Sequence, residues 1–451
     1  MQNMEIKKNQ ECKLTITSLG SEGQGVGRTG DFVVFVADTL PGETVLAQII
    51  KVGKNYAIGK LIRVLEPSPD RVAPRCGLAT LCGGCTLQHM RYERQLDAKR
   101  QIVEDALVRL GGFADIQVQA TLGMDEPWRY RNKGSFPFGE QGGQAAIGLF
   151  APRSHRLLPV SDCIIQDERV MRVAKQAEVW ANACDLPAYR ETDGSGSLRH
   201  VVVRATEEGE VTAIIVTAKL LSQEKERELK AQLVDVDSLH HSFNDKNTNV
   251  IFGDSFQLLQ GKSSLQTCIG GLLFSVGPAS FLQVNPIQTE KLYAETMRLL
   301  APKTDEYIVD IYCGIGTLSL LAASRAAHVI GIENVAAAVE NARENATLNG
   351  LDNVEFHRGN AEEVLPKLVS EGLRLSAVIV DPPRKGCDPA VLRAIAQSGA
   401  SRVAYISCNP ATLARDLKFL CADGFALVHV QPVDMFPQTA HVETVVLLHR
   451  T

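Results

Sequence analysis

The chain has 451 residues, of which 45% are hydrophobic and 22% are charged, and this composition excludes collagen-like and intrinsically disordered proteins. Its formal net charge of −5 excludes a surface that is basic throughout, although a local patch is enough for nucleic-acid contact. Residues 1–10 contain no apolar signal-peptide core, and no run of about 18 apolar residues occurs, so we expect a cytoplasmic protein that does not enter a membrane. At about 100 to 200 residues per domain, the length corresponds to two to four domains.

Residues 13–64 alternate apolar and polar residues in short runs that are separated by Gly-rich or Pro-Gly breaks. This pattern predicts about five short strands, the size of an OB-like β-barrel, which is a fold that often binds nucleic acids. The sequence Glu-Pro-Ser-Pro-Asp-Arg at residues 66–71 predicts the linker that follows. We therefore expect a barrel over residues 1–68 that presents a nucleic-acid-binding face.

Basic residues are concentrated in the N-terminal part of the chain. Residues 51–100 hold ten Lys or Arg against four Asp or Glu, whereas residues 161–451 hold 27 against 36. The run Trp-Arg-Tyr-Arg-Asn-Lys at residues 128–133 adds aromatic side chains between cations, a combination that suits contacts with RNA phosphates and bases. We expect the basic side of the protein to be N-terminal.

The middle of the chain combines helical and strand-like patterns. Apolar periodicity predicts a helix over residues 92–110, which Gly111 and Gly112 end. Residues 135–275 mix strand-like runs with one predicted helix at residues 167–183. We expect a mixed α+β middle domain over residues 69–275.

From residue 276 onward, strand-like and helical segments alternate, which predicts an α/β fold with a parallel, doubly wound sheet. The last two predicted strands have no helix between them, so they form an antiparallel hairpin at one edge. This ending is typical of a class I methyltransferase sheet and not of a dinucleotide-dependent dehydrogenase. We expect the catalytic domain over residues 276–451.

A glycine turn follows the first strand of this domain and precedes a helix, so Gly314 and Gly316 allow a close approach of the backbone to a ligand. A dinucleotide site would have a third glycine at position 319, which is Ser319, so the turn favours an adenosyl ligand. Glu333 ends the next strand, in position to accept hydrogen bonds from ribose hydroxyls. A solvated loop acid is its alternative interpretation.

Two later strands end in further polar residues at the same predicted edge of the sheet. Asn360 is placed to reach an adenine edge. Asp381 begins the sequence Asp-Pro-Pro-Arg, whose prolines fix a rigid turn beside the reacting groups. Related motifs serve methylation of amino groups, so this sequence does not identify the target atom.

Cys408 lies at the predicted carboxyl end of the fifth strand, where a cysteine can act as a nucleophile. Carbon 5 of a pyrimidine is a poor nucleophile, but addition of a thiolate to carbon 6 allows carbon 5 to attack a methylsulfonium group. A base must then remove the proton from carbon 5. Glu443 and His441 are both placed near the terminal hairpin and both could serve as this base.

Three cysteines are closely spaced in the motif Cys76-x5-Cys82-Gly-Gly-Cys85, and Cys163 is the candidate for a fourth ligand. Four thiolates suit a zinc ion or an iron–sulfur cluster equally well in ligand number. The residues alone do not choose between the two metals.

Together these residues resemble the family of S-adenosylmethionine-dependent RNA uracil-5-methyltransferases that carry an N-terminal TRAM domain and a [4Fe-4S] cluster, in its 23S ribosomal RNA branch. The resemblance covers nearly the whole chain. It is most specific at residues 407–416, Ser-Cys-Asn-Pro-Ala-Thr-Leu-Ala-Arg-Asp, and at residues 436–443, Phe-Pro-Gln-Thr-Ala-His-Val-Glu. It implies that residues 1–68 are a TRAM domain, that Cys408 is the nucleophile and that Glu443 is the base.

The resemblance also implies the cofactors. Cys76, Cys82, Cys85 and Cys163 fall on the ligands of the [4Fe-4S] cluster. The positions that contact S-adenosylmethionine fall on Gln283, Tyr312, Thr317, Glu333, Asn360 and Asp381, beside Gly314 and Gly316. Leu282, where an aromatic residue is common, and Thr317, where a more polar residue is common, are mild departures.

The expected activity is methylation of carbon 5 of uridine in 23S ribosomal RNA. Relatives that modify tRNA look leaner, without the TRAM domain and the cluster, and both features are indicated here. The alternatives are a tRNA uracil-5-methyltransferase, a cytosine-5 enzyme and a non-catalytic RNA-binding assembly factor. We expect a monomer with no protein partner.

Overall fold

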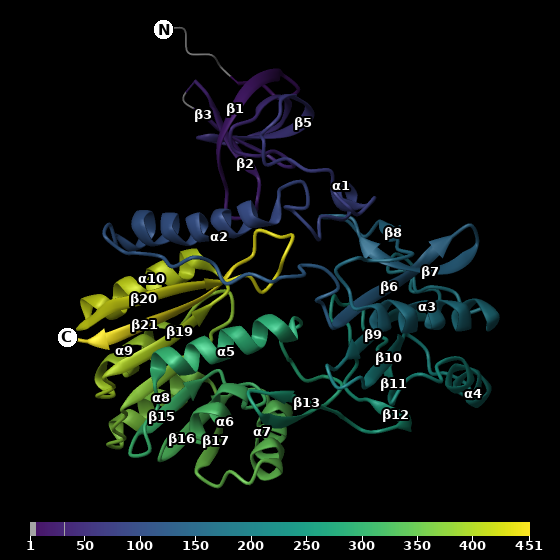
Figure 1. Cartoon of the computed structure of the whole chain (residues 1–451). Coiled ribbons are helices and arrows are strands. Elements are labelled where there is room, and N and C mark those ends of the chain that lie inside the picture. The colour runs from purple at the N-terminus through teal and green to yellow at the C-terminus, as the bar shows by residue number, and fades with distance from the viewer. Residues whose placement is uncertain (1–5, 31) are drawn as a thin grey trace.

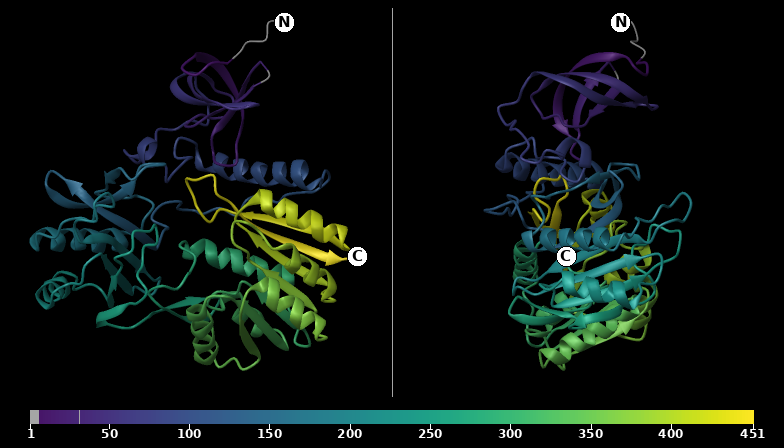
Figure 2. Two further views of the ribbon diagram at one scale, coloured as in Figure 1. Left: turned by 180° about the vertical axis from the view of Figure 1, so that it is seen from behind. Right: turned by 90° about the vertical axis from the view of Figure 1, so that its right-hand side faces the viewer.

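We describe the protein from a computed structural model, which covers residues 6–30 and 32–451. The first residues of the chain and Asp31, which begins one of the expected strands, lie outside the described residues. Figure 1 shows a barrel that stands over the helix α2, a C-terminal sheet below this helix, and a separate middle sheet to the side. The view from behind shows the same arrangement, and in the view from the side the barrel again stands above the rest of the chain (Figure 2).

The N-terminal strands form a closed barrel in the order β1-β2-β3-β5-β4. β3 and β5 are parallel, and the other pairs are antiparallel. Alternate residues, including Leu14, Ile16 and Val45, point inward and form the barrel core. The strands are β1 (Glu11–Leu19), β2 (Gly25–Thr29), β3 (Phe32–Val36), β4 (Thr44–Val52) and β5 (Tyr56–Glu66).

Two helices and a π-helical turn follow the barrel. These are α1 (Ala79–Cys82), α2 (Tyr92–Ala106) and the π-helix η1 (Leu107–Gly111). Gly112, with φ 81°, ends this segment in the left-handed conformation. Val103 and Leu107 belong to the core of the C-terminal domain, so α2 packs on that domain although it precedes the middle sheet in the chain.

The middle domain is a sheet of seven strands in the order β12-β11-β10-β9-β6-β7-β8. Only β10 and β11 are parallel among these neighbours. α3 covers one face and buries Trp180 and Val173 against the sheet. The elements are β6 (Lys133–Gln141), β7 (Gln144–Phe150), β8 (Leu157–Pro159), α3 (Glu168–Ala183), β9 (Leu198–Ala205), β10 (Val211–Thr217), α4 (Gln223–Gln232), β11 (Ser238–Phe243) and β12 (Gln257–Gly261).

The hairpin of β13 (Leu265–Ile269) and β14 (Leu272–Val276) leads to α5 (Pro286–Leu300) and the C-terminal domain. Its seven-stranded sheet has the order β17-β16-β15-β18-β19-β21-β20, in which the first five are parallel and β21 is antiparallel to both neighbours. Its elements are β15 (Tyr307–Ile311), α6 (Thr317–Ala323), β16 (His328–Glu333), α7 (Ala336–Leu348), β17 (Val354–Arg358), α8 (Ala361–Ser370), β18 (Ala377–Val380), α9 (Pro389–Gln397), β19 (Arg402–Ser407), α10 (Pro410–Ala422), β20 (Phe425–Val433) and β21 (Glu443–Arg450).

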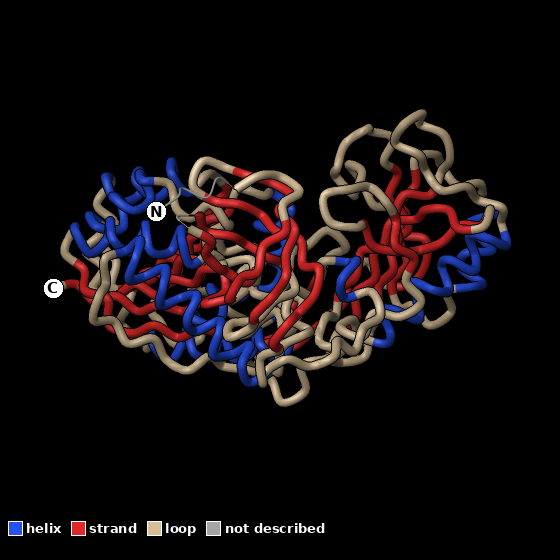
Figure 3. Tube along the Cα trace, turned by 90° about the horizontal axis from the view of Figure 1, so that it is seen from above, coloured by secondary structure: helices blue, strands red, loops and turns tan. Residues whose placement is uncertain are grey.

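This arrangement confirms the expected α/β class with a terminal antiparallel hairpin, an N-terminal barrel and a mixed middle domain. Two large apolar clusters lie on the two faces of the C-terminal sheet, because each parallel strand is covered by helices on both sides. Seen from above, the middle sheet forms a body beside the barrel and the C-terminal domain (Figure 3). Among the described residues, no helix is both long and apolar enough to cross a membrane.

Several of the cations that the sequence placed in a basic N-terminal region are paired with acids inside the structure. Arg71 contacts the buried carboxylate of Glu43, and Arg91 and Arg94 both contact Asp70. Lys99 is completely buried against Asp434. Counting charges over residues 51–100 therefore overestimates the positive charge available to RNA, because Arg71 and Lys99 are paired with acids outside that segment, Glu43 and Asp434.

Candidate active site

A cavity of about 830 Å³ opens at the carboxyl ends of the parallel strands of the C-terminal sheet. This is the position at which open α/β sheets bind ligands. The cavity is lined by most of the residues that the sequence singled out for a cofactor or for catalysis: Gln283, Tyr312, Gly314, Thr317, Glu333, Asn360, Asp381, Cys408 and Glu443. The topology thus brings together residues that are up to 160 positions apart in the chain.

Gly316 is not among the residues that line the cavity, and its contribution is to the turn. It caps α6 with φ 84°, a conformation that L side chains rarely adopt. A Cβ at this position would lie 3.0 Å from the Phe356 ring and 3.2 Å from the Ala342 Cβ. Tyr312 and Gly314 also have positive φ, 68° and 55°, so the whole turn curls tightly beneath the cavity.

The carboxylate of Glu333 holds this turn. It accepts hydrogen bonds from the backbone N–H of Gly314 at 3.1 Å and from that of Val335 at 2.8 Å. Asn360 precedes α8 and accepts a hydrogen bond from the Asn334 side chain at 3.4 Å. Both side chains also line the cavity. They therefore stabilise the loops and can contact a bound ligand at the same time.

Acidic groups dominate the electrostatics of the cavity. Burial raises the pKa of Asp310 to about 7 and that of Asp381 to about 6. One oxygen of Asp310 accepts a hydrogen bond from Ser319 at 2.6 Å, and the other is buried with no partner among the described residues. A cationic ligand would stabilise the ionised forms of these carboxyls, so the cavity favours a positively charged molecule.

Cys408 follows β19 and precedes α10, and its side chain is partly buried at the cavity. Asn409 caps the helix by accepting from the backbone N–H of Ala411 at 3.1 Å, and Pro410 occupies the first turn. Burial and the charges of Glu443 and Asp381 raise the pKa of Cys408 to about 11, whereas Arg384 lowers it. In the free enzyme this residue is therefore a thiol at neutral pH.

Glu443 is the first residue of β21, with only 5% of its surface exposed. Burial, followed by the charge of Asp381, raises its pKa to about 8. His441 is exposed and is not among the residues that line the cavity. Of the two alternatives for the base, only Glu443 shares the cavity with Cys408.

The loop that carries Arg384 is held by side chains of α10, which the sequence did not reveal. Asn409 and Thr412 donate to the Arg384 carbonyl at 3.2 and 3.3 Å, and Arg415 donates to the Lys385 carbonyl at 3.0 Å. Buried Asp416 accepts from the backbone N–H of Cys387 at 2.8 Å. The helix that follows the candidate nucleophile thus fixes the cation whose charge acts on Cys408 and Glu443.

The four cysteines of the expected metal site lie near one another at the edge of the middle domain. Cys85 and Cys163 pack against the same small apolar cluster of Met124, Tyr130 and Ile165. Burial raises the pKa of Cys85 to about 12, and the charges of its neighbours Cys163, Cys82 and Cys76 add to this rise.

The donors at this site fit a metal cluster in type and number, because all four are free thiols. Their spacing in this structure does not fit one. Within the residues that the structure covers, no group of three or more His, Cys, Asp or Glu side chains has an arrangement that could hold a metal ion.

Family models match both parts of the chain in which a function was expected. The model described as tRNA (Uracil-5-)-methyltransferase matches residues 222–451, and the TRAM domain model matches residues 6–62. The first match includes every cavity residue named above, and the second coincides with the barrel.

Relatives from two clostridia match over almost their full length. An "uncharacterized RNA methyltransferase" of Clostridium tetani is 43% identical, over 99% of this chain and 98% of the relative. Another of the same description, from Clostridium acetobutylicum, is 41% identical over the same shares.

A solved structure shares the whole architecture. The tRNA (uracil-54, C5)-methyltransferase of Pyrococcus abyssi, in complex with S-adenosyl-L-homocysteine, is 25% identical with a TM-score of 0.79. The match covers 97% of this chain and 99% of that one, so it includes the barrel and the middle domain. The chain therefore belongs to the tRNA (uracil-5-)-methyltransferase family and is an RNA methyltransferase with an N-terminal TRAM domain.

Proposed function

We propose that this protein methylates carbon 5 of uridine in 23S ribosomal RNA, with S-adenosylmethionine as the methyl donor. The observation that carries the proposal is that Cys408 and Glu443 line one cavity together with Glu333, Asn360 and Asp381. The last three lie where the adenosyl and methionine parts of the donor are expected. The proposed nucleophile, the proposed base and the proposed donor site thus share one cavity.

In the proposed reaction, the Cys408 thiolate adds to carbon 6 of the flipped uracil, which makes carbon 5 nucleophilic. Carbon 5 then takes the methyl group from the sulfonium, and S-adenosylhomocysteine is the second product. Glu443 removes the proton from carbon 5, and the electron pair of that bond forms the 5,6 double bond as Cys408 leaves. A target base in an RNA loop is the easiest to flip out of its stack.

The charges of the cavity favour this sequence of steps. The cationic sulfonium is attracted by Asp310 and Asp381, and its binding lowers the pKa of these acids and of Glu443. Arg384 favours the thiolate of Cys408 and the carboxylate of Glu443. Binding of the methyl donor therefore prepares both catalytic groups in their ionised forms.

The choice of ribosomal RNA rests on the barrel together with the cysteine motif, the combination that the sequence resemblance associates with the 23S branch. tRNA is the second candidate, because the Pyrococcus abyssi structure aligned over 97% of this chain is that of a tRNA (uracil-54, C5)-methyltransferase. That alignment also means that the barrel by itself does not distinguish the two substrates.

The proposal is tested by incubating the purified protein with methyl-labelled S-adenosylmethionine and an RNA transcript. One reaction contains 23S ribosomal RNA and a separate reaction contains tRNA. We expect label in 5-methyluridine from the 23S transcript. Label in 5-methyluridine from tRNA alone would show that tRNA is the substrate, and it would agree with the proposed reaction at carbon 5. Label in any other nucleoside would reject the reaction itself.

We also propose, on the strength of the sequence resemblance alone, that Cys76, Cys82, Cys85 and Cys163 hold a [4Fe-4S] cluster once the loops that carry them move closer together than in this structure. Anaerobically purified protein is then brown, with broad absorption in the visible range and about four iron atoms per chain. Cys85→Ser should lose most of this iron. Cys184→Ser, which alters a thiol outside the motif, is the matched control and should retain it. A colourless protein that contains zinc would contradict the assignment.

A further inference from the structure

The segment that connects β20 to Glu443, residues 434–442, is the point at which distant parts of the chain meet. We call it the Glu443 loop. Although it is not a strand or a helix, all of its residues except Phe436 and His441 are buried. Phe436 lines the cavity, and Glu443 follows the loop directly. The conformation of this loop therefore decides where the proposed base lies.

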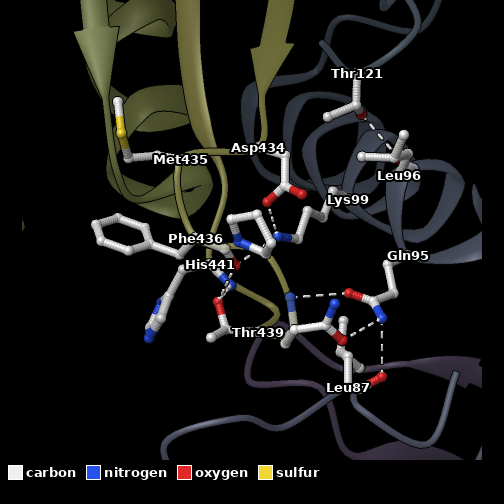
Figure 4. Close-up of polar contacts among 12 residues, drawn as sticks. Leu87, Gln95, Leu96, Lys99, Thr121, Asp434, Met435, Phe436, Thr439 and His441 are labelled. Carbon is white, nitrogen blue, oxygen red and sulfur yellow. Dashed lines mark hydrogen bonds and ion pairs between the residues drawn. The ribbon is translucent and has the colours of Figure 1, made fainter. Parts of the chain in front are cut away.

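Lys99 of α2 holds one end of the loop. Its ammonium group and the carboxylate of Asp434 form an ion pair in which neither side chain is exposed. The same ammonium donates to the Phe436 carbonyl at 3.0 Å (Figure 4). Tyr92 donates to the second oxygen of Asp434 at 2.7 Å and accepts from the Met124 N–H at 2.9 Å, so the carboxylate has a partner on each oxygen.

Gln95, one turn earlier in α2, holds the middle of the loop. Its side-chain N–H donates to the side-chain oxygen of Gln438 at 3.0 Å, and its own oxygen accepts from the Gln438 backbone N–H at 3.0 Å. Gln438 has φ 70°, a left-handed conformation that is unfavourable for a residue other than glycine. The two contacts from Gln95 stabilise this conformation.

Two residues that follow the cysteine motif, Thr86 and Leu87, also contact the Glu443 loop. Leu87 donates its N–H to the Gln438 carbonyl at 2.9 Å, and the Thr86 hydroxyl accepts from the Ala440 N–H at 3.1 Å. Thr86 follows Cys85 directly in the chain. Ala440 also packs with Leu87 and Ile102, so this end of the loop is fixed by apolar contacts as well.

We propose that Lys99 and Gln95 are positioning residues, which brace the Glu443 loop so that Glu443 and Phe436 face the cavity. This inference rests on the proposed function of Glu443 as the base. Neither residue lines the cavity, so neither contacts the reacting atoms. A buried ion pair is a poor source of stability compared with apolar packing, which points to a role in fixing one conformation.

The test uses the full-length protein and the double variant K99M/D434N. Lys99→Met alone would leave Asp434 charged and buried without its cation, and such a variant can fail to fold. Asp434→Asn removes that charge, and its amide oxygen still accepts from Tyr92. The control is R402M/E306Q, which removes another mostly buried pair, with contacts of 2.6 and 2.7 Å, at the opposite end of β19 from Cys408.

Two readouts separate positioning from simple support of the fold. Hydrogen exchange measured by mass spectrometry reports the amides of Gln438 and Ala440 without any reaction. Single-turnover methylation of RNA reports the covalent RNA adduct on Cys408, because slow removal of the proton from carbon 5 makes the adduct accumulate. S-adenosylhomocysteine affinity is measured in parallel as a check that the cavity is intact.

For K99M/D434N we expect at least tenfold faster exchange in residues 434–442, at least tenfold slower single-turnover formation of free methylated RNA, accumulated adduct, and affinity for S-adenosylhomocysteine within twofold of the parent. The control should leave exchange in this loop and the adduct fraction unchanged. Parent-like exchange, or fast exchange with a parent-like single-turnover rate, would contradict the proposal that Lys99 and Gln95 position the loop. If the parent itself forms no 5-methyluridine, the proposed function fails, while the exchange measurement still decides whether Lys99 holds the loop.

Discussion

Replacing Glu443 by glutamine is expected to stabilise the protein at neutral and alkaline pH, although it removes the proposed base. Glu443 is buried, and its pKa is raised from 4.5 to about 8. Below pH 4.5 the carboxyl is protonated in both the folded and the unfolded chain. Between pH 4.5 and 8 the unfolded chain releases this proton and the folded protein keeps it, so the contribution of Glu443 to the free energy of unfolding decreases as the pH rises.

The size of the effect follows from the shift in pKa. Each unit corresponds to about 1.4 kcal/mol, so the stability difference between Glu443→Gln and the parent grows to about 3 kcal/mol at pH 7 and levels off near 5 kcal/mol above pH 8. Structural relaxation around the ionised carboxylate reduces the cost of its burial, so the measured difference should not exceed these values.

Urea unfolding of the parent and of Glu443→Gln between pH 5 and 9 measures this difference. We expect the two stabilities to diverge with rising pH, in favour of the variant. Glu306→Gln changes another carboxyl of the same domain, one that is paired with Arg402, and is the matched control that should not gain stability with pH. A constant difference between the parent and Glu443→Gln across the pH range would refute a buried, protonated Glu443.

The remaining predictions concern the donor site and the nucleophile. Gly316→Ala should weaken the binding of S-adenosylhomocysteine at least tenfold, as measured by calorimetry. The φ of 84° disfavours alanine, and the new Cβ would lie 3.0 Å from the Phe356 ring, so the turn has to move. Unchanged affinity would show that the turn does not shape the donor site. The ratio of affinities for S-adenosylmethionine over S-adenosylhomocysteine should rise as the pH increases from 5 to 8, because Asp381 and Asp310, with pKa values of about 6 and 7, become charged and attract the sulfonium; a flat ratio would contradict the acidic cavity. Cys408→Ala should lower methylation of RNA by more than a thousandfold with unchanged donor affinity, and residual turnover above that level would point to another nucleophile.

The fold could be predicted from the sequence because its signals are local. Alternation of short apolar runs predicts the barrel, and the change to alternating strands and helices after residue 276 predicts the parallel sheet. The ends of those strands carry Glu333, Asp381 and Cys408, and the rule that carboxyl ends of parallel strands share one edge is enough to bring them together.

The brace of the Glu443 loop could not be predicted, because its contacts join residues far apart in the chain. Lys99 and Asp434 are separated by 335 positions, and in the sequence each looks like a surface charge. Gln95 and Lys99 lie on the buried face of α2 beside Ile102 and Val103. Because Gln95 and Lys99 are polar, the apolar periodicity of the sequence does not predict that they are buried. The left-handed conformation of Gln438 has no sequence signal, since it depends on the two hydrogen bonds from Gln95.

The most direct test of the account is the mass of the product that Glu443→Gln forms with RNA and S-adenosylmethionine. Without a base to remove the proton from carbon 5, the methylated uridine should remain attached to Cys408. Digestion with trypsin and nuclease should then give the Cys408 peptide, residues 403–415, carrying one methylated uridine nucleotide, and Cys408→Ala in the same background should give none. An adduct on another cysteine, or methylated RNA that is released freely with no adduct, would contradict the mechanism.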